Sequence, residues 1–133
     1  MFLVDASVWV AAVTPQHPQY SEAERFLRAA APLTVLDLTL YEVANVVARK
    51  YGELEVARKL VQGLFRASTR PPLRVDATLL EDGLELIGEH GLTSYDAAYV
   101  AAARRYGWQL VSLDLRDLVA KGLAVTPDAA VYP

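Results

Sequence analysis

A chain of 133 residues is long enough for one domain that buries about two-thirds of the surface exposed by its unfolded form. Hydrophobic residues make up 53% of it and charged residues 22%, which is typical of a globular fold and excludes a disordered one. The net charge of −3 argues against a protein that coats nucleic acid by bulk attraction. The absence of cysteine excludes disulfides, thiolate metal sites and a cysteine nucleophile.

The sequence also lacks the features of a membrane or secreted protein. Its apolar runs are all shorter than the roughly 20 residues that a membrane span requires. The first residues carry no basic leader and meet an acid at Asp5. We therefore expect no signal peptide, no membrane association and a cytoplasmic location.

The first part of the chain alternates strand and helix patterns. A short apolar strand is predicted at residues 2–4, followed by a helix at 6–13 that a proline-rich turn ends. A second helix is predicted at 21–31, because its apolar residues fall on one face. A strand at 33–36 follows.

Apolar residues recur at helical spacing through much of the remaining chain. Helices are predicted at residues 39–51, 53–67, 77–89, 94–106 and 115–121. Strands are predicted at residues 73–75, 108–113 and 124–126. Strands that alternate with helices indicate an α/β fold, here a three-layer sandwich with a central parallel sheet between helices. No repeat or linker divides the chain, so residues 1–133 are expected to form a single domain.

Four acids interrupt otherwise apolar stretches: Asp5, Glu42, Asp96 and Asp114. Burying a carboxylate is costly unless it is paired, hydrogen-bonded or bound to a metal. Asp5 and Asp114 end predicted strands, whereas Glu42 and Asp96 lie in the first turns of predicted helices. Ligands of open α/β sheets bind beyond the carboxyl ends of the strands. We therefore expect the four carboxylates to converge at that edge.

Each acid also has a purely structural explanation as a helix cap. The segment from Thr39 to Glu42 matches a capping box, and the segment from Thr93 to Asp96 is close to one. The two acids at strand ends precede helices, where N-cap aspartates are common. Capping explains each acid alone, but four converging carboxylates would repel one another unless a cation lay among them.

The chemistry of the four acids favours a hard divalent cation. Oxygen-only ligands select Mg²⁺, with Mn²⁺ as a substitute, over zinc. Such a site suits the hydrolysis of phosphodiester bonds. The two histidines, His17 and His90, fall in loop-like positions and are not expected to be catalytic.

Four short motifs occur in an order that resembles that of the PIN-domain nucleases, and among them the VapC type of toxin ribonuclease. The motifs are Val-Asp5-Ala-Ser7, Glu42-Val-Ala-Asn45, Ser94-Tyr-Asp96-Ala-Ala-Tyr and Ser112-Leu-Asp114. Each motif alone is weak, but their order and spacing are more specific and cover nearly the whole chain. The resemblance implies a Mg²⁺- or Mn²⁺-dependent endoribonuclease in which these four acids are the catalytic and metal-binding residues.

Four further residues are candidates for a supporting role. Ser7 matches the family's small hydroxyl residue after the first acid, and Ser112 occupies a position where the family often has threonine. Asn45 lies one turn after the second acid and is equally well explained as a surface or cap residue. Asp117 could add a water-mediated ligand, or it could serve only as an acid in the first turn of the last helix.

The resemblance further implies an RNA substrate, a small antitoxin that wraps the nuclease, and a homodimer. Candidate interface residues are Trp9, Leu60, Val61, Leu64 and Phe65, although ordinary core packing explains them better. Candidate RNA-binding residues are Arg104, Arg105 and Arg116, although exposed arginines are more often simply solvated.

Two other interpretations remain open. A phosphotransfer domain also places acids and Mg²⁺ at strand ends. A phosphatase of that kind requires Asp-x-Asp where this chain has Asp5-Ala-Ser7, and a receiver requires a lysine at the end of a late strand. A non-catalytic PIN-like domain that only binds RNA or a protein would keep the acids as caps. The variant Asp96→Asn separates this interpretation from the enzyme, because only an enzyme would lose cleavage while it stays folded.

Overall fold

The computed structural model describes residues 1–30 and 32–131. Within them, three short parallel strands form a central sheet in the order β2-β1-β3. The middle strand β1 (Phe2–Val4) pairs with β2 (Leu33–Thr34) on one side and with β3 (Gln109–Val111) on the other. The parallel sheet predicted from the sequence is confirmed, with shorter strands.

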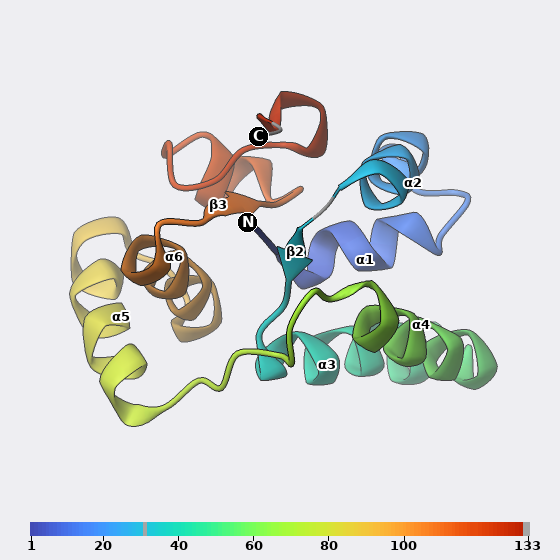
Figure 1. Cartoon of the computed structure of the whole chain (residues 1–133), viewed down its shortest axis with the longest axis horizontal. Helices are drawn as coiled ribbons and strands as arrows, with labels where there is room; N and C mark the ends of the chain where they lie inside the picture. The colour runs from blue at the N-terminus through green and yellow to red at the C-terminus, as the bar shows by residue number, and fades with distance from the viewer. Residues whose placement is uncertain (31, 132–133) are drawn as a thin grey trace.

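Helices cover both faces of this sheet, as the three-layer prediction requires (Figure 1). One layer contains α1 (Ala6–Ala12), α2 (Tyr20–Ala29), α3 (Asp37–Ala44) with its π-helical continuation η1 (Asn45–Lys50), and α4 (Leu54–Ala67). The other layer contains α5 (Ala77–His90) and α6 (Ser94–Tyr106). The chain continues after β3 with the π-helical segment η2 (Leu115–Val119) and the 3-10 turn η3 (Pro127–Ala129).

The strand β1 contributes to two hydrophobic cores, because successive side chains of a strand point to opposite faces of the sheet. Phe2 and Val4 pack in the cluster formed with α1 to α4, and Leu3 packs in the cluster formed with α5 and α6. All three side chains are at most 2% exposed. A strand buried on both faces has a continuous apolar sequence, which is the pattern that identified it.

Two predicted strands are reduced to single bridges. Leu73 pairs only with Leu36, and Val125 pairs only with Val111. Each forms two backbone hydrogen bonds, to Val35 and Asp37 in the first case and to residues flanking Val111 in the second. The chain turns away on both sides of each bridge, so the predicted strands at 73–75 and 124–126 do not form.

The helix boundaries agree with the predictions to within about two residues. The helix predicted at 94–106 has those ends in α6, and Gly107 closes it in the left-handed conformation with φ 66°. The helix predicted at 39–51 begins two residues earlier, at Asp37. The predicted end of another helix, Ala31, lies outside the described residues.

The candidate interface residues are mostly core. Trp9, Leu60 and Leu64 are at most 7% exposed, whereas Phe65 is 54% exposed. Core packing therefore explains most of this set, and Phe65 alone of these four presents a large apolar surface. Among the described residues no helix is long and apolar enough to cross a membrane.

Candidate active site

Asp5 follows β1 and is held from both sides by hydroxyl groups. Its Oδ1 accepts hydrogen bonds from the backbone N–H of Ser7 at 3.0 Å and from the Ser7 hydroxyl at 2.5 Å, and its Oδ2 accepts one from the Ser112 hydroxyl at 2.5 Å. The residue is only 5% exposed. Burial raises the pKa of Asp5 to about 6, although the two serines act against the rise.

The two serines tie the ends of β1 and β3 together. The Ser7 oxygen accepts the backbone N–H of Leu113 at 2.8 Å, and the Ser112 oxygen accepts that of Asp114 at 3.0 Å. Because each hydroxyl accepts a backbone N–H and donates to Asp5, the donors and acceptors of this network are matched. The Asp5 carboxylate is thus fixed in position before any ligand arrives.

Glu42 lies in α3 and does not cap it. The expected N-cap, Thr39, is inside the helix, and its Oγ1 accepts the backbone N–H of Leu36 at 3.1 Å. Glu42 instead accepts a 2.7 Å hydrogen bond from the hydroxyl of Tyr99 on α6. Burial raises the pKa of Glu42 to about 7, the Tyr99 hydrogen bond opposes this, and the charge of Asp5 adds to it. The capping explanation is wrong for this residue.

Asp96 occupies the first turn of α6. Thr93 is the N-cap of this helix, and its Oγ1 accepts the backbone N–H of Asp96 at 3.1 Å. Burial raises the pKa of Asp96 to about 6, and the charges of Asp114 and Asp117 raise it further. The cap prediction is confirmed for Thr93, while the Asp96 carboxylate faces other carboxylates.

Asp114 follows β3 and caps η2, because its Oδ1 accepts the backbone N–H of Asp117 at 2.9 Å. Asp5 likewise caps α1. The capping explanation is therefore correct for both acids at strand ends. Each carboxylate oxygen has two lone pairs, so the capping hydrogen bonds do not exclude a second role for these acids.

The four predicted acids line one hollow of about 350 Å³ at the carboxyl edge of the sheet. They come from four places in the chain: the ends of β1 and β3, the middle of α3 and the start of α6. Among the described residues that line this hollow there is no lysine or arginine. In the part of the chain that the structure describes, no three histidine or acid side chains lie close enough to hold one ion between them.

Several other predicted residues lie outside this hollow. Asn45 is exposed and lines a neighbouring depression, and Asp117 contacts Arg116 and Lys121 at the surface. Arg104 and Arg105 line a separate hollow between α5 and α6, where Arg105 pairs with Asp82 at 2.6 Å. The prediction that these arginines lie near the acids is wrong, because they occupy the opposite end of α6 from Asp96.

Three residues that were not predicted to belong to the site also line the hollow: His17, Tyr51 and Tyr99. Tyr99 was inside the Tyr-Asp-Ala-Ala-Tyr motif, one turn after Asp96, and this spacing was the available signal. Nothing in the local sequence indicates that His17 and Tyr51 approach the acids.

Carboxylates in this arrangement disfavour one another's ionised form. Burial is the first cause of the raised pKa values of Asp5, Glu42 and Asp96, and neighbouring carboxylates contribute to each. A divalent cation would remove the repulsion, and carboxylate oxygens are the donors that Mg²⁺ and Mn²⁺ prefer. The donor chemistry of the hollow therefore fits a hard cation.

Comparison with known proteins agrees with this picture. The family model of the PIN domain matches residues 2–121. The chain therefore belongs to the PIN-domain family. It is 38% identical to Ribonuclease VapC3 of Pyrobaculum aerophilum over 130 residues, which cover 94% of this chain and 98% of that protein. This similarity assigns it to the VapC type within the family, as the four motifs predicted.

Solved structures share its fold. VapC20 of Mycobacterium tuberculosis, a toxin that cleaves the sarcin–ricin loop, aligns with a TM-score of 0.77 at 23% identity over 92% of this chain and 95% of that chain. A toxin–antitoxin complex from Klebsiella pneumoniae contains a chain that aligns with a TM-score of 0.73 at 22% identity, over 96% of this chain and 98% of that chain. The α/β fold with a central parallel sheet is thereby confirmed.

Proposed function

We propose that this chain is a Mg²⁺-dependent endoribonuclease, with Mn²⁺ able to substitute, and that it is the toxin of a toxin–antitoxin pair. The observation that carries the proposal is the hollow lined by Asp5, Glu42, Asp96 and Asp114, which we propose as the catalytic and metal-binding residues. Ser7 and Ser112 would support Asp5, and residues 1–133 would form a single nuclease domain. Family membership favours this activity over a phosphotransfer domain.

In the hollow, hydroxyl groups orient two of the carboxylates that would hold a bound cation. When bound, the cation would polarise the scissile phosphate and lower the pKa of an attacking water. The two serine hydroxyls hold Asp5 in one orientation, and the Tyr99 hydroxyl holds Glu42. Asp96 and Asp114 approach from α6 and the end of β3. Fixed carboxylates lose little freedom on binding, which favours affinity.

The decisive experiment is calorimetric titration with Mn²⁺ at neutral pH, because it requires no knowledge of the RNA target. Wild type is compared with Asp5→Asn and Asp96→Asn, and Asp82→Asn serves as a control because that residue lies in a separate hollow. We expect specific binding in wild type and the control and its loss in the other two variants. Ribonuclease activity on total RNA, measured with the same proteins, should follow the same order.

The non-catalytic alternative predicts a different pattern. If the acids have no catalytic role, wild type binds no Mn²⁺ and cleaves no RNA with or without the ion. In that case Asp96→Asn, whose carboxylate caps nothing in the structure, would also leave the binding of RNA or of a protein partner unchanged. Binding of Mn²⁺ by all four proteins alike would instead indicate a cation site elsewhere.

We also propose a small antitoxin as a protein partner, RNA as the substrate and a homodimer as the assembly. The structural relative from Klebsiella pneumoniae is a toxin–antitoxin complex, which supports the first of these. Two exposed aromatic residues that line a shared depression, Tyr41 of α3 at 76% and Tyr95 of α6 at 56%, offer surface for assembly. Light scattering tests the dimer, and co-purification with the protein of a neighbouring small gene tests the antitoxin.

A further inference from the structure

A second hollow, of about 740 Å³, adjoins the acidic one. It lies between the turn that joins α1 to α2 and the segment from η1 to the start of α4. Val13, Val47 and Val56 give it apolar walls, and Thr14, Gln16 and Glu53 add polar groups. His17 and Tyr51 line both hollows, so the two lie side by side and share these two residues. Its size is that of a small-molecule site.

His17 is held in one orientation at the junction of the two hollows. Its Nδ1 accepts the backbone N–H of Gln19 at 3.0 Å, so in the neutral ring the proton lies on Nε2. The turn around it is fixed by further backbone hydrogen bonds, from the N–H of His17 to the carbonyl of Thr14 at 2.8 Å and from Tyr20 to the carbonyl of His17 at 3.0 Å. The ring therefore offers an oriented N–H donor beside the acids.

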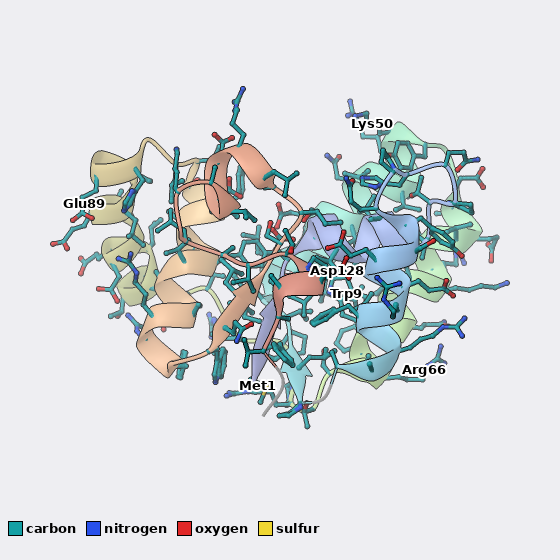
Figure 2. All side chains as sticks on the ribbon, turned by 90° about the horizontal axis from the view of Figure 1, so that it is seen from above. Met1, Trp9, Lys50, Arg66, Glu89 and Asp128 are labelled. Atoms are coloured by element: carbon teal, nitrogen blue, oxygen red, sulfur yellow. The ribbon has the colours of Figure 1, made fainter. Side chains whose placement is uncertain are left out.

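Tyr51 supplies an accessible aromatic ring on the other wall. It is 43% exposed, and it follows two basic residues, Arg49 and Lys50, at the end of η1. In the part of the chain that the structure describes, neither forms an ion pair with a carboxylate. In Figure 2, β1 runs from Met1 toward the upper end of the molecule, and Lys50 lies at that end. Arg66 lies nearer the lower end, where Met1 is.

We propose that the larger hollow binds the nucleobase next to the scissile phosphate, stacked on Tyr51, while His17 Nε2 donates a hydrogen bond to the phosphate. An occupant of both hollows must join a flat apolar face to an anionic group that a cation can hold among the acids. A nucleotide has both parts, linked by a sugar. Arg49 and Lys50, the exposed basic residues that directly precede Tyr51, suit the phosphates that continue along the strand.

This subsite rests on the proposed ribonuclease function and gives it a substrate-binding residue set. It also changes which basic residues are proposed to bind the RNA. Arg49 and Lys50, which precede Tyr51, take this role in place of Arg104 and Arg105, because those two line a different hollow.

The test is an NMR titration of the ¹⁵N-labelled protein with nucleoside 5′-monophosphates and with ribose 5-phosphate, each with and without Mg²⁺. These ligands share the sugar and phosphate and differ only in the base, and none contains a phosphodiester bond that a ribonuclease could cleave. We expect the nucleotides to bind about tenfold more tightly than ribose 5-phosphate, the usual effect of stacking one base on an aromatic ring. The backbone amides from Thr14 to His17 should shift with the nucleotides.

Matched variants separate the two contacts. Tyr51→Ala should remove the preference for nucleotides and leave ribose 5-phosphate binding unchanged. Tyr106→Ala is its control, because Tyr106 is also 43% exposed but stacks on Trp108 outside both hollows. His17→Ala should weaken nucleotides and ribose 5-phosphate by the same factor, whereas His90→Ala should weaken neither.

The outcomes distinguish this subsite from the nuclease proposal. Equal affinities for nucleotides and ribose 5-phosphate in a protein that cleaves RNA would overturn the subsite alone. A preference for nucleotides that Tyr51→Ala removes, in a protein without ribonuclease activity, would support the subsite and contradict the activity. Stronger shifts with a hexaglutamate peptide than with any nucleotide would identify the hollow as a protein-docking surface, and the proposal would be wrong.

Discussion

Tyr99 on α6 donates a 2.7 Å hydrogen bond to Glu42 on α3, a residue 57 positions earlier in the chain. The Tyr99 oxygen also lies 2.7 Å from the Oγ1 of Thr39. Since Tyr99 has one hydroxyl proton and donates it to Glu42, its oxygen accepts the proton of Thr39, whose Oγ1 in turn accepts the backbone N–H of Leu36. Three hydrogen bonds thus run in one direction, from the backbone at the end of the β2 segment to the carboxylate of Glu42.

Removing this hydroxyl should weaken cation binding at neutral pH. The Tyr99 hydrogen bond lowers the pKa of Glu42, which burial raises to about 7. In Tyr99→Phe the pKa of Glu42 rises further, so the acid limb of the pH profile for Mn²⁺ affinity and for RNA cleavage should move to higher pH. The buried hydroxyl of Thr39 also loses its acceptor, which should lower the free energy of unfolding by about 1–2 kcal/mol.

The matched control is Tyr95→Phe on the same helix, because Tyr95 is 56% exposed. Its pH profile and its unfolding in urea should match those of wild type. A pH profile of Tyr99→Phe that keeps the wild-type acid limb would show that the hydrogen bond does not affect ionisation of the site.

Asp96→Asn should stabilise the metal-free protein at alkaline pH. The folded-state pKa is raised from 3.8 to about 6, so ionisation opposes folding. This destabilisation is absent below pH 3.8, develops as the pH rises to about 6 and is complete above it. After discounting for the partial exposure of Asp96, we expect the free energy of unfolding of the variant to exceed that of wild type by about 1 kcal/mol at pH 8.

Urea unfolding at pH 8 and at pH 4, with a chelator present, measures this effect. The difference between variant and wild type should shrink at the lower pH. A variant that unfolds more easily at pH 8 would mean that the carboxylate contributes to the helix, as a cap would. The true cap, Thr93, provides the comparison, since Thr93→Ala should cost about 1 kcal/mol at both pH values.

Divalent-cation affinity should fall as the pH is lowered. Metal ligands must be deprotonated, and the pKa values of Asp5, Glu42 and Asp96 are about 6, 7 and 6 without metal. Below pH 7 protons therefore compete with the ion. Calorimetry with Mn²⁺ should show a loss of at least about tenfold between pH 7.5 and pH 5.5. Constant affinity over that range would contradict a shared site.

Ser112→Ala tests the hydrogen bond that the Ser112 hydroxyl donates to Asp5. The Ser112 hydroxyl is the strongest of the hydrogen bonds that oppose the raised pKa of Asp5. Without it the pKa of Asp5 rises, so Mn²⁺ affinity at pH 6.5 should fall several-fold, with a smaller loss at pH 8.5 where Asp5 is ionised in both proteins. Ser112→Thr keeps the hydroxyl and should restore the wild-type pH dependence. An equal loss at both pH values would indicate a role in packing instead.

Local sequence patterns determined most of the strands and helices of this protein. The continuous apolar run of Phe2 to Val4, the helical spacing of Ser94 to Tyr106 and the glycine after it are local patterns, and the structure has the elements that they predict. The placement of Asp5 and Asp114 followed from the same source. Both end parallel strands, and parallel strands bring their carboxyl ends to one edge of a sheet.

The partners of these acids were decided only by tertiary structure. The hydrogen bond from Ser112 to Asp5 joins residues 107 positions apart, so no periodic pattern within a single element could predict it. Glu42 had a convincing local explanation in the capping-box pattern, which failed because α3 begins at Asp37 and directs Glu42 toward Tyr99. The arginines of α6 were misplaced for a related reason, since a helix rises about 1.5 Å per residue and carries its last turn away from its first. Sequence fixes which face of an element is apolar; packing between elements determines which polar groups meet, because that depends on distances across the chain.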